Sequence, residues 1–70
     1  MASNVKRVSV NLTERDLEAI RFLAEHGGTN PTVAVQRALQ LSRFFAEEVK
    51  RGSKVLLRRP DGSMVEVVIR

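Results

Sequence analysis

The sequence predicts a small α+β fold with one β-strand near the N-terminus, two helices after it, and a β-hairpin at the C-terminus. Apolar and polar residues alternate over residues 8–12, and two capped stretches with helical spacing occupy residues 13–52. Two β-rich runs then flank the tripeptide Pro60-Asp61-Gly62. We therefore expect two regions, a domain over residues 1–51 and a hairpin extension over residues 52–70.

The first element is a strand with one apolar and one polar face, because side chains alternate with a period of two. Its apolar set is Val8, Val10 and Leu12, and its polar set is Arg7, Ser9 and Asn11. A helix start follows directly, so this strand has no nearby hairpin partner, and an isolated strand cannot satisfy its backbone N–H and C=O groups. We expect its partner to be the same strand of a second chain.

The first helix is predicted from its cap. Thr13 is a favourable N-cap residue, and Glu14 and Asp16 place negative charge in the first turn, where it meets the positive end of the helix dipole. Apolar residues recur after the cap at helical spacing. Gly27-Gly28 ends this helix.

The second helix is predicted to start at Asn30, a favourable cap, with Pro31 in the first helical position. It ends near residues 50–52, where basic residues precede a glycine. Apolar residues, among them Leu39 and Phe45, lie on more than one of its sides. Apolar residues on several sides are typical of a helix that contacts both its own subunit and a neighbouring one.

The C-terminal hairpin is predicted over Lys54 to Arg59 and Ser63 to Arg70. Pro60 supplies a fixed φ for the turn and Gly62 the left-handed position. One apolar face of this hairpin is formed by Val65, Val67 and Ile69, with Val55 and Leu57 opposite them.

The composition limits the class of protein. The chain has 70 residues, no Cys and one His, so neither disulfides nor a Cys and His zinc site supports its core. A chain of this size buries only about 60% of its unfolded surface, which leaves a second subunit as the remaining support. A ligand pocket of about 300 Å³ would consume most of such a core. We expect a binding module with no catalytic residues, cofactor or metal.

The charge indicates the kind of partner. The net charge of +4 doubles in a dimer and favours polyanions. Residues 1–11 contain Lys6 and Arg7 and no acid. The chain contains neither the apolar run of a signal peptide nor one long enough to span a membrane. We therefore expect a nucleic-acid partner, a cytoplasmic and nucleoid-associated location, and no membrane partner.

The order of elements resembles that of the ribbon-helix-helix family of DNA-binding proteins, the MetJ/Arc/CopG type. The likeness is carried by K-R-V-S-V-N-L-T-E-R-D-L-E-A-I, from Lys6 to Ile20, and by G-G-T-N-P-T-V-A-V-Q-R-A-L, from Gly27 to Leu39. It implies an intertwined homodimer in which two strands form an antiparallel ribbon above four helices. The dimer core would then include Val8, Val10, Leu12, Leu39 and Phe45.

The resemblance also implies that the ribbon enters the major groove of double-stranded DNA, and a two-stranded ribbon is narrow enough to do so. With the apolar face toward the helices, the side chains directed to the bases are Arg7, Ser9 and Asn11. Arg pairs with guanine and Asn with adenine through two hydrogen bonds each. The alternative is that these three residues form only the solvated face of a half-buried strand, and Asn11 alone could be a turn residue.

The family places the N-terminus of its second helix against the DNA backbone. The matching positions are Thr29, Asn30 and Thr32, which would meet a phosphate with the positive end of the helix dipole. Helix capping alone would require the same residues. Lys6 is a further expected phosphate contact, and Arg15 and Arg37 are weaker ones.

The function we expect is that of a transcriptional repressor that binds a specific DNA sequence as a homodimer. The alternative is an antitoxin, or a plasmid-partition or copy-control protein, that binds DNA and also a protein partner through its C-terminal segment. A purely structural dimer is the third possibility. The hairpin departs from the shortest members of the family, and we expect it to pack within the dimer. The alternatives are that it joins dimers into higher assemblies on DNA or binds another protein.

Overall fold

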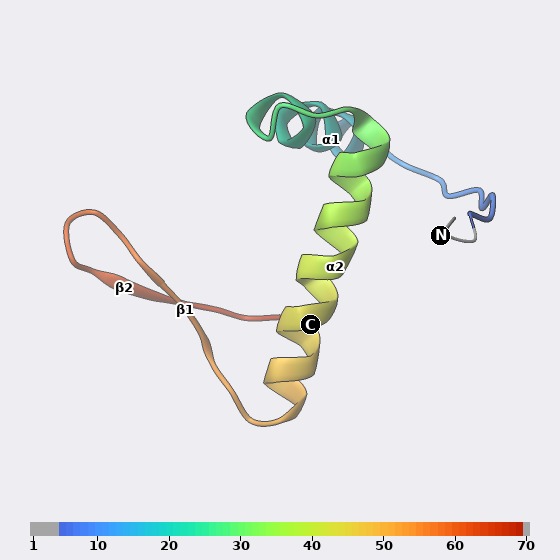
Figure 1. The fold of residues 1–70 in the computed structure, drawn as a ribbon. Coiled ribbons are helices and arrows are strands. Elements are labelled where there is room, and N and C mark those ends of the chain that lie inside the picture. Colours follow the sequence, from blue (N-terminus) through green and yellow to red (C-terminus); the bar gives the residue numbers. More distant parts are fainter. Residues whose placement is uncertain (1–4, 70) are drawn as a thin grey trace.

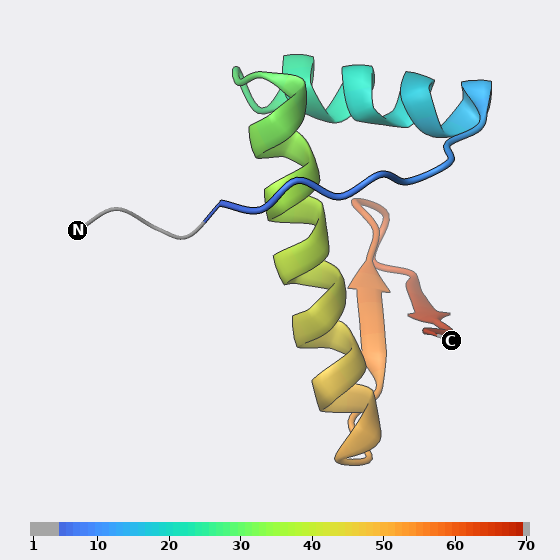
Figure 2. The ribbon, with the colours of Figure 1, turned by 90° about the vertical axis from the view of Figure 1, so that its right-hand side faces the viewer.

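The computed structural model describes residues 5–69, which form two helices followed by a two-stranded antiparallel sheet (Figure 1). The elements are α1 (Glu14–His26), α2 (Pro31–Lys50), β1 (Val55–Arg58) and β2 (Met64–Val67). The predicted α+β class, both helices and the hairpin are confirmed. Residues 5–12 form no strand within the single chain and run as an extended segment across α2 (Figure 2). Arg70, the last residue of the predicted hairpin, lies outside the described residues.

Helix α1 begins with the predicted cap. The Thr13 hydroxyl accepts a hydrogen bond from the Asp16 N–H at 3.1 Å, and the Asp16 carboxylate accepts one from the Thr13 N–H at 3.0 Å. Two otherwise unpaired N–H groups are satisfied by this reciprocal box. At the other end, Gly28 adopts the left-handed region with φ 62°, which glycine occupies without steric cost. The chain can therefore turn directly into the next cap.

Helix α2 begins at the predicted Asn30 cap, whose side-chain oxygen accepts from the Val33 N–H at 2.9 Å. Pro31 occupies the first helical position, where its missing N–H costs nothing. The helix ends at Lys50 with Arg51 as its C-cap, and Gly52 turns the chain away with φ 97°. Both predicted ends of α2 are thus confirmed.

Very little of the chain is buried. Among residues 5–69 the only buried apolar residues are Ala24 of α1 and Ala34 of α2, close to the turn that joins the two helices. The Cα radius of gyration is 15.0 Å, whereas a compact chain of this length has about 11 Å. The accessible surface is 6945 Å², and a folded monomer of this mass exposes about 4,400 Å². The single chain is therefore too open to be a self-sufficient globule.

The hairpin has the predicted turn, and its strands pair in a defined register. Val55 lies opposite Val67 and Leu57 opposite Val65, so these four residues share one face, as predicted. In the turn, the Gly62 N–H donates to the Arg59 carbonyl at 2.9 Å, and Gly62 has φ 90°. A turn closed in this way, with glycine in the left-handed position, is a common hairpin connection.

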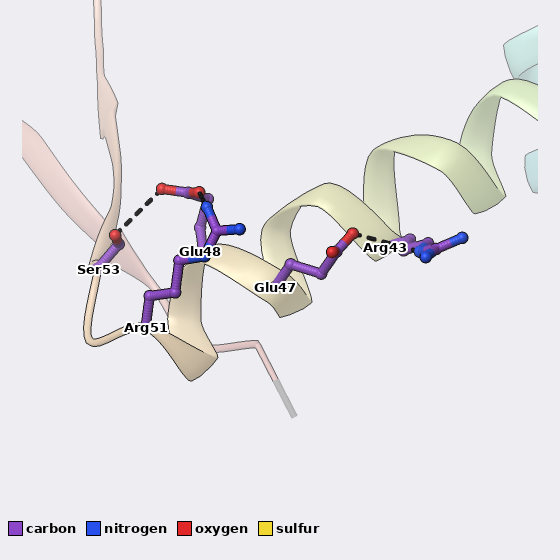
Figure 3. A network of polar contacts seen from close by, with 5 residues as sticks. All are labelled: Arg43, Glu47, Glu48, Arg51 and Ser53. Atoms are coloured by element: carbon purple, nitrogen blue, oxygen red, sulfur yellow. Dashed lines mark hydrogen bonds and ion pairs between the residues drawn. The ribbon is translucent and has the colours of Figure 1, made fainter.

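Both strands are shorter than predicted, and at the open end of the hairpin Ser53 is bonded to α2. The register would place Ser53 opposite Ile69, but the Ser53 N–H donates to the Glu48 carbonyl at 3.0 Å. Its hydroxyl donates to the Glu48 carboxylate at 3.1 Å, as Figure 3 shows. These two bonds fix the chain that leaves α2 and end the ladder at Val55.

The residues predicted for the dimer core do not form a core within one chain. Val8, Val10, Leu12 and Leu39 are exposed, and Phe45 is half-buried. Phe22 of α1 is exposed as well, and it stacks on His26, with ring centroids 5.9 Å apart. Their burial would require a second chain.

Candidate nucleic-acid interface

The extended segment over residues 5–12 separates its two sets of side chains. Its apolar residues line a groove of about 420 Å³ against the helices, and its polar residues do not take part in that lining. The groove is lined from the segment by Val8, Val10 and Leu12, from α1 by Asp16, Ala19, Ile20 and Leu23, and from α2 by Ala34, Val35, Ala38, Leu39 and Ser42. The alternation predicted from the sequence therefore matches the lining of the groove.

The segment covers this groove only in part. Val8 is 82% exposed and Val10 68% exposed, although both border the groove. The backbone of residues 5–12 has no hydrogen-bonded partner strand among residues 5–69. The segment thus exposes apolar side chains at the groove, and its backbone has no partner strand.

The predicted DNA-contacting side chains of the segment are all accessible. Lys6, Arg7, Ser9 and Asn11 are exposed, and within the described part of the chain none of them makes a hydrogen bond or ion pair. Two of the four are cationic, and no acid lies between residues 5 and 12. The outward face of the segment can therefore donate hydrogen bonds to a polyanion without first breaking internal contacts.

The second group of predicted residues lies at the start of α2. Asn30 caps the helix, and its backbone carbonyl also accepts from the Ala34 N–H at 3.0 Å. Because this cap engages the N–H groups of Val33 and Ala34 and Pro31 has none, Thr32 offers the remaining N–H of the first turn. The cap thus leaves one N–H of the first turn for an anion.

A cation lies close to this helix start. A smaller groove of about 260 Å³ is lined by both Thr29 and Arg37. The Arg37 guanidinium is so near the turn that a Cβ added to Gly27 would lie 3.4 Å from it. The structure thus brings together Thr29 and Arg37, which the sequence indicated only separately. Arg15, the other weaker expectation, is exposed on α1 and is not part of this group.

The charged residues of the hairpin were given no functional role from the sequence. Lys54, Arg58 and Arg59 are exposed, and they make no ion pair within residues 5–69. Counting charges region by region along the sequence would have found them, because acids are scarce after residue 49.

No metal site is formed by the described side chains, since no three His, Asp or Glu residues among them come together. Neither helix is long and apolar enough to serve as a membrane-spanning segment.

Comparisons of the chain with protein-family models, with curated proteins and with solved structures give no match. The function is therefore inferred from the residues and geometry of the chain itself.

Proposed function

We propose that this chain is a sequence-specific double-stranded DNA-binding protein that acts as a homodimer, with the role of a transcriptional repressor. The observation that carries the proposal is the division of residues 5–12 into a groove-lining apolar set and an outward polar set. A segment of this kind is suited to pair with its own copy and to present its polar face to DNA.

The surface of the single chain supports the dimer. The accessible area of 6945 Å² exceeds that of a compact monomer by about 2,500 Å². Obligate homodimers bury about 2,000 to 5,000 Å² in total between their subunits. A second copy would cover the groove, bury Leu39 and Val10, and supply the strand that residues 5–12 lack. The two segments would then form the antiparallel ribbon that the resemblance implies.

The ribbon would present Arg7, Ser9 and Asn11 from each chain to the base edges of the major groove. A two-stranded ribbon fits that groove, and Arg and Asn each recognise one purine through two hydrogen bonds. Symmetry doubles the set of side chains, so the recognised site would be a short palindrome. Lys6 would bind the adjacent phosphate backbone.

The start of α2 would bind phosphate on each side of the ribbon. Thr32 offers a backbone N–H there, Asn30 caps the positive end of the helix dipole, and Thr29 and Arg37 line the groove beside it. These contacts are independent of sequence, and they would fix the register of the dimer on the duplex.

The folded hairpin favours a repressor over an antitoxin. Antitoxins of the ribbon-helix-helix family, which this chain resembles, usually bind their toxin through a disordered tail. In this chain, residues 55–67 form a hydrogen-bonded hairpin with a closed turn. A tail that folds without a partner fits a protein whose principal partner is DNA.

The test starts by selecting bound duplexes from a random pool and continues with two variants. Arg7→Ala should weaken binding to the selected site by about 10- to 100-fold for the loss of a two-bonded base contact, and should change binding to random DNA much less. Arg21→Ala removes the same charge from an exposed position on α1 and should leave both affinities near wild type. Equal affinities of the Arg7 variant and wild type for the selected site would refute the assignment of Arg7.

A further inference from the structure

The C-terminal hairpin is a two-stranded sheet with no further strand beside it in the described part of the chain. Two-stranded hairpins are only marginally stable in water, and a third strand or a packed helix stabilises them. Ser53 attaches this hairpin to the end of α2 through two bonds with Glu48, but both faces expose apolar side chains. Leu57 on one face is 56% exposed, and Leu56 and Met64 on the other are 52% and 54% exposed. The hairpin therefore has apolar surface left for a partner.

The hydrogen bonds near the turn show which backbone groups of the hairpin face outward. The Arg59 N–H donates to the Ser63 carbonyl at 2.8 Å, so these two residues form a bonded pair. Bonded and non-bonded pairs alternate along an antiparallel ladder. From the register, Leu56 and Glu66 then form a non-bonded pair. Their N–H and C=O groups are directed to the outer edges of β1 and β2, and so are those of every second residue on either side.

The two edges of the hairpin differ in charge. Natural edge strands avoid pairing with other chains through charged side chains, Lys above all. The β1 edge is protected in this way, because Lys54, Arg58 and Arg59 lie on or beside that strand. Strand β2 and the two residues after it read MVEVVI, with one charge, Glu66, and four β-branched residues, which favour strands. The β2 edge is thus the less protected of the two.

The hairpin stays accessible when the proposed dimer forms. In both views it lies on the side of α2 opposite to residues 5–12 (Figures 1 and 2). The groove that a second copy would fill is lined by that segment, so it lies on the segment's side of α2. A second copy in the groove, and DNA on the ribbon, would both leave the hairpin free. This position favours a contact between dimers over the packing within one dimer that the sequence predicts.

We propose that the β2 edge is a self-association surface, at which hairpins of two neighbouring dimers pair into a four-stranded antiparallel sheet. This inference rests on the proposed function and adds a further level of assembly to it. The outward backbone groups of Glu66 and Val68 supply the hydrogen bonds, and the pairing extends β2 over residues 68–69. Each dimer carries two such edges, so the pairing joins it to further dimers.

Charge and symmetry favour one register for this pairing. A two-fold axis through Glu66 would place the two Glu66 carboxylates opposite each other, where like charges are destabilising. An axis through Val67 instead places Glu66 opposite Val68 of the second copy. This register also aligns residues 65–69 with their own copy, so that the whole β-branched run is paired. The apolar face of each hairpin then continues across the four strands.

The chain contains no Cys, so a single introduced Cys reports this register. The two Val67 residues would form a non-bonded pair with Cα atoms about 4.5 Å apart, which is within the span of a disulfide. Val67→Cys should therefore form covalent dimers on mild oxidation. Val55→Cys is the matched control, since Val55 lies opposite Val67 in the same hairpin and is also half-buried. Its two copies would be about 14 Å apart, across three strand spacings, and should not be linked.

Proline variants test which edge associates. Proline is tolerated at an edge position whose N–H faces outward, but it removes the donor that a neighbouring strand would need. Glu66→Pro blocks the β2 edge and Leu56→Pro the β1 edge, at directly opposite positions. In sedimentation equilibrium, wild type and Leu56→Pro should associate beyond the dimer. Glu66→Pro should do so about 10- to 100-fold more weakly, because the contact loses a backbone hydrogen bond from each copy. Backbone NMR spectra check that both variants keep the hairpin, and the cysteine variants answer the question independently of them.

Equal linking of the two cysteine variants, or equal loss of association in the two proline variants, would overturn the assignment to β2. Efficient linking of Val67→Cys in a protein that is never larger than a dimer would also overturn it, because the hairpins would then pair within one dimer. A wild-type protein that is only dimeric, is not linked through Val67→Cys and still binds the selected DNA site would overturn this inference and leave the proposed function intact. A wild-type chain that is monomeric at every concentration tested would overturn both.

Discussion

Shortening Val10 to alanine should weaken the dimer while leaving each chain's helices intact. Val10 is 68% exposed in the single chain and borders the apolar groove. The substitution removes two methyl groups, which contribute about 0.8 kcal/mol each when fully buried. If the second chain buries the part that is still exposed, the loss is about 1 kcal/mol per chain and about 2 kcal/mol per dimer. The dimer dissociation constant should then rise about 30-fold.

Val68 provides a matched control for this experiment. It is 66% exposed, nearly the same as Val10, but it lies after β2 and outside the groove. Sedimentation equilibrium and the concentration dependence of thermal unfolding both report the dissociation constant. Val68→Ala should leave it near wild type. Equal effects of the two substitutions, or a wild-type chain that stays monomeric and folded at micromolar concentration, would refute the reasoning from exposed surface.

Three further predictions concern single positions. Asn30→Asp keeps the cap on Val33 and adds favourable charge at a helix start, so the melting temperature should stay the same or rise. The added negative charge should weaken binding to specific and random DNA alike, as measured by fluorescence anisotropy. Unchanged binding would contradict the role of this helix start in phosphate binding. Hydrogen bonds from the Ser63 side chain, and then from its backbone, lower the pKa of Asp61 below 3.8. These bonds therefore stabilise the hairpin above pH 3.8, and the stabilisation is lost as the pH falls through the lowered pKa. Ser63→Ala should bring the pKa of Asp61, followed by NMR, back toward its ordinary value, and an unchanged titration would exclude this cause. The Cβ added by Gly62→Ala meets no atom within 4 Å, but the alanine has to adopt φ 90°, so the substitution should destabilise the hairpin by about 1–2 kcal/mol. NMR spectra should lose the chemical shifts of the hairpin and keep those of the helices. A fully retained hairpin would contradict this prediction.

The local features of the fold could be predicted because they follow short-range rules. Thr13 and Asn30 each have a side-chain oxygen within reach of the N–H three residues later, which is enough to fix a helix start. Likewise, Pro60 and Gly62 fix the turn, and the turn fixes the register of the strands on either side.

Strand length and the state of the N-terminal segment could not be predicted in the same way. The hairpin stops short because Glu48 binds Ser53, a contact between a helix and a loop that hydropathy patterns do not encode. Residues 5–12 have a clear strand pattern, yet one chain offers them no neighbouring strand. Of the candidate site, the residues and their alternation could be predicted from the sequence, and only the structure brought Thr29 and Arg37 together.

The two buried alanines have a mechanical consequence. Ala24 and Ala34 are the only fully buried apolar side chains of α1 and α2 within residues 5–69, whereas the larger Ile20 and Val35, which line the groove, are half-buried. Small side chains fix the angle between two helices less firmly than interlocking large ones do. The angle between the helices is then set largely by whatever fills the adjoining groove. An occupant of the groove would therefore also set the distance between residues 5–12 and the start of α2.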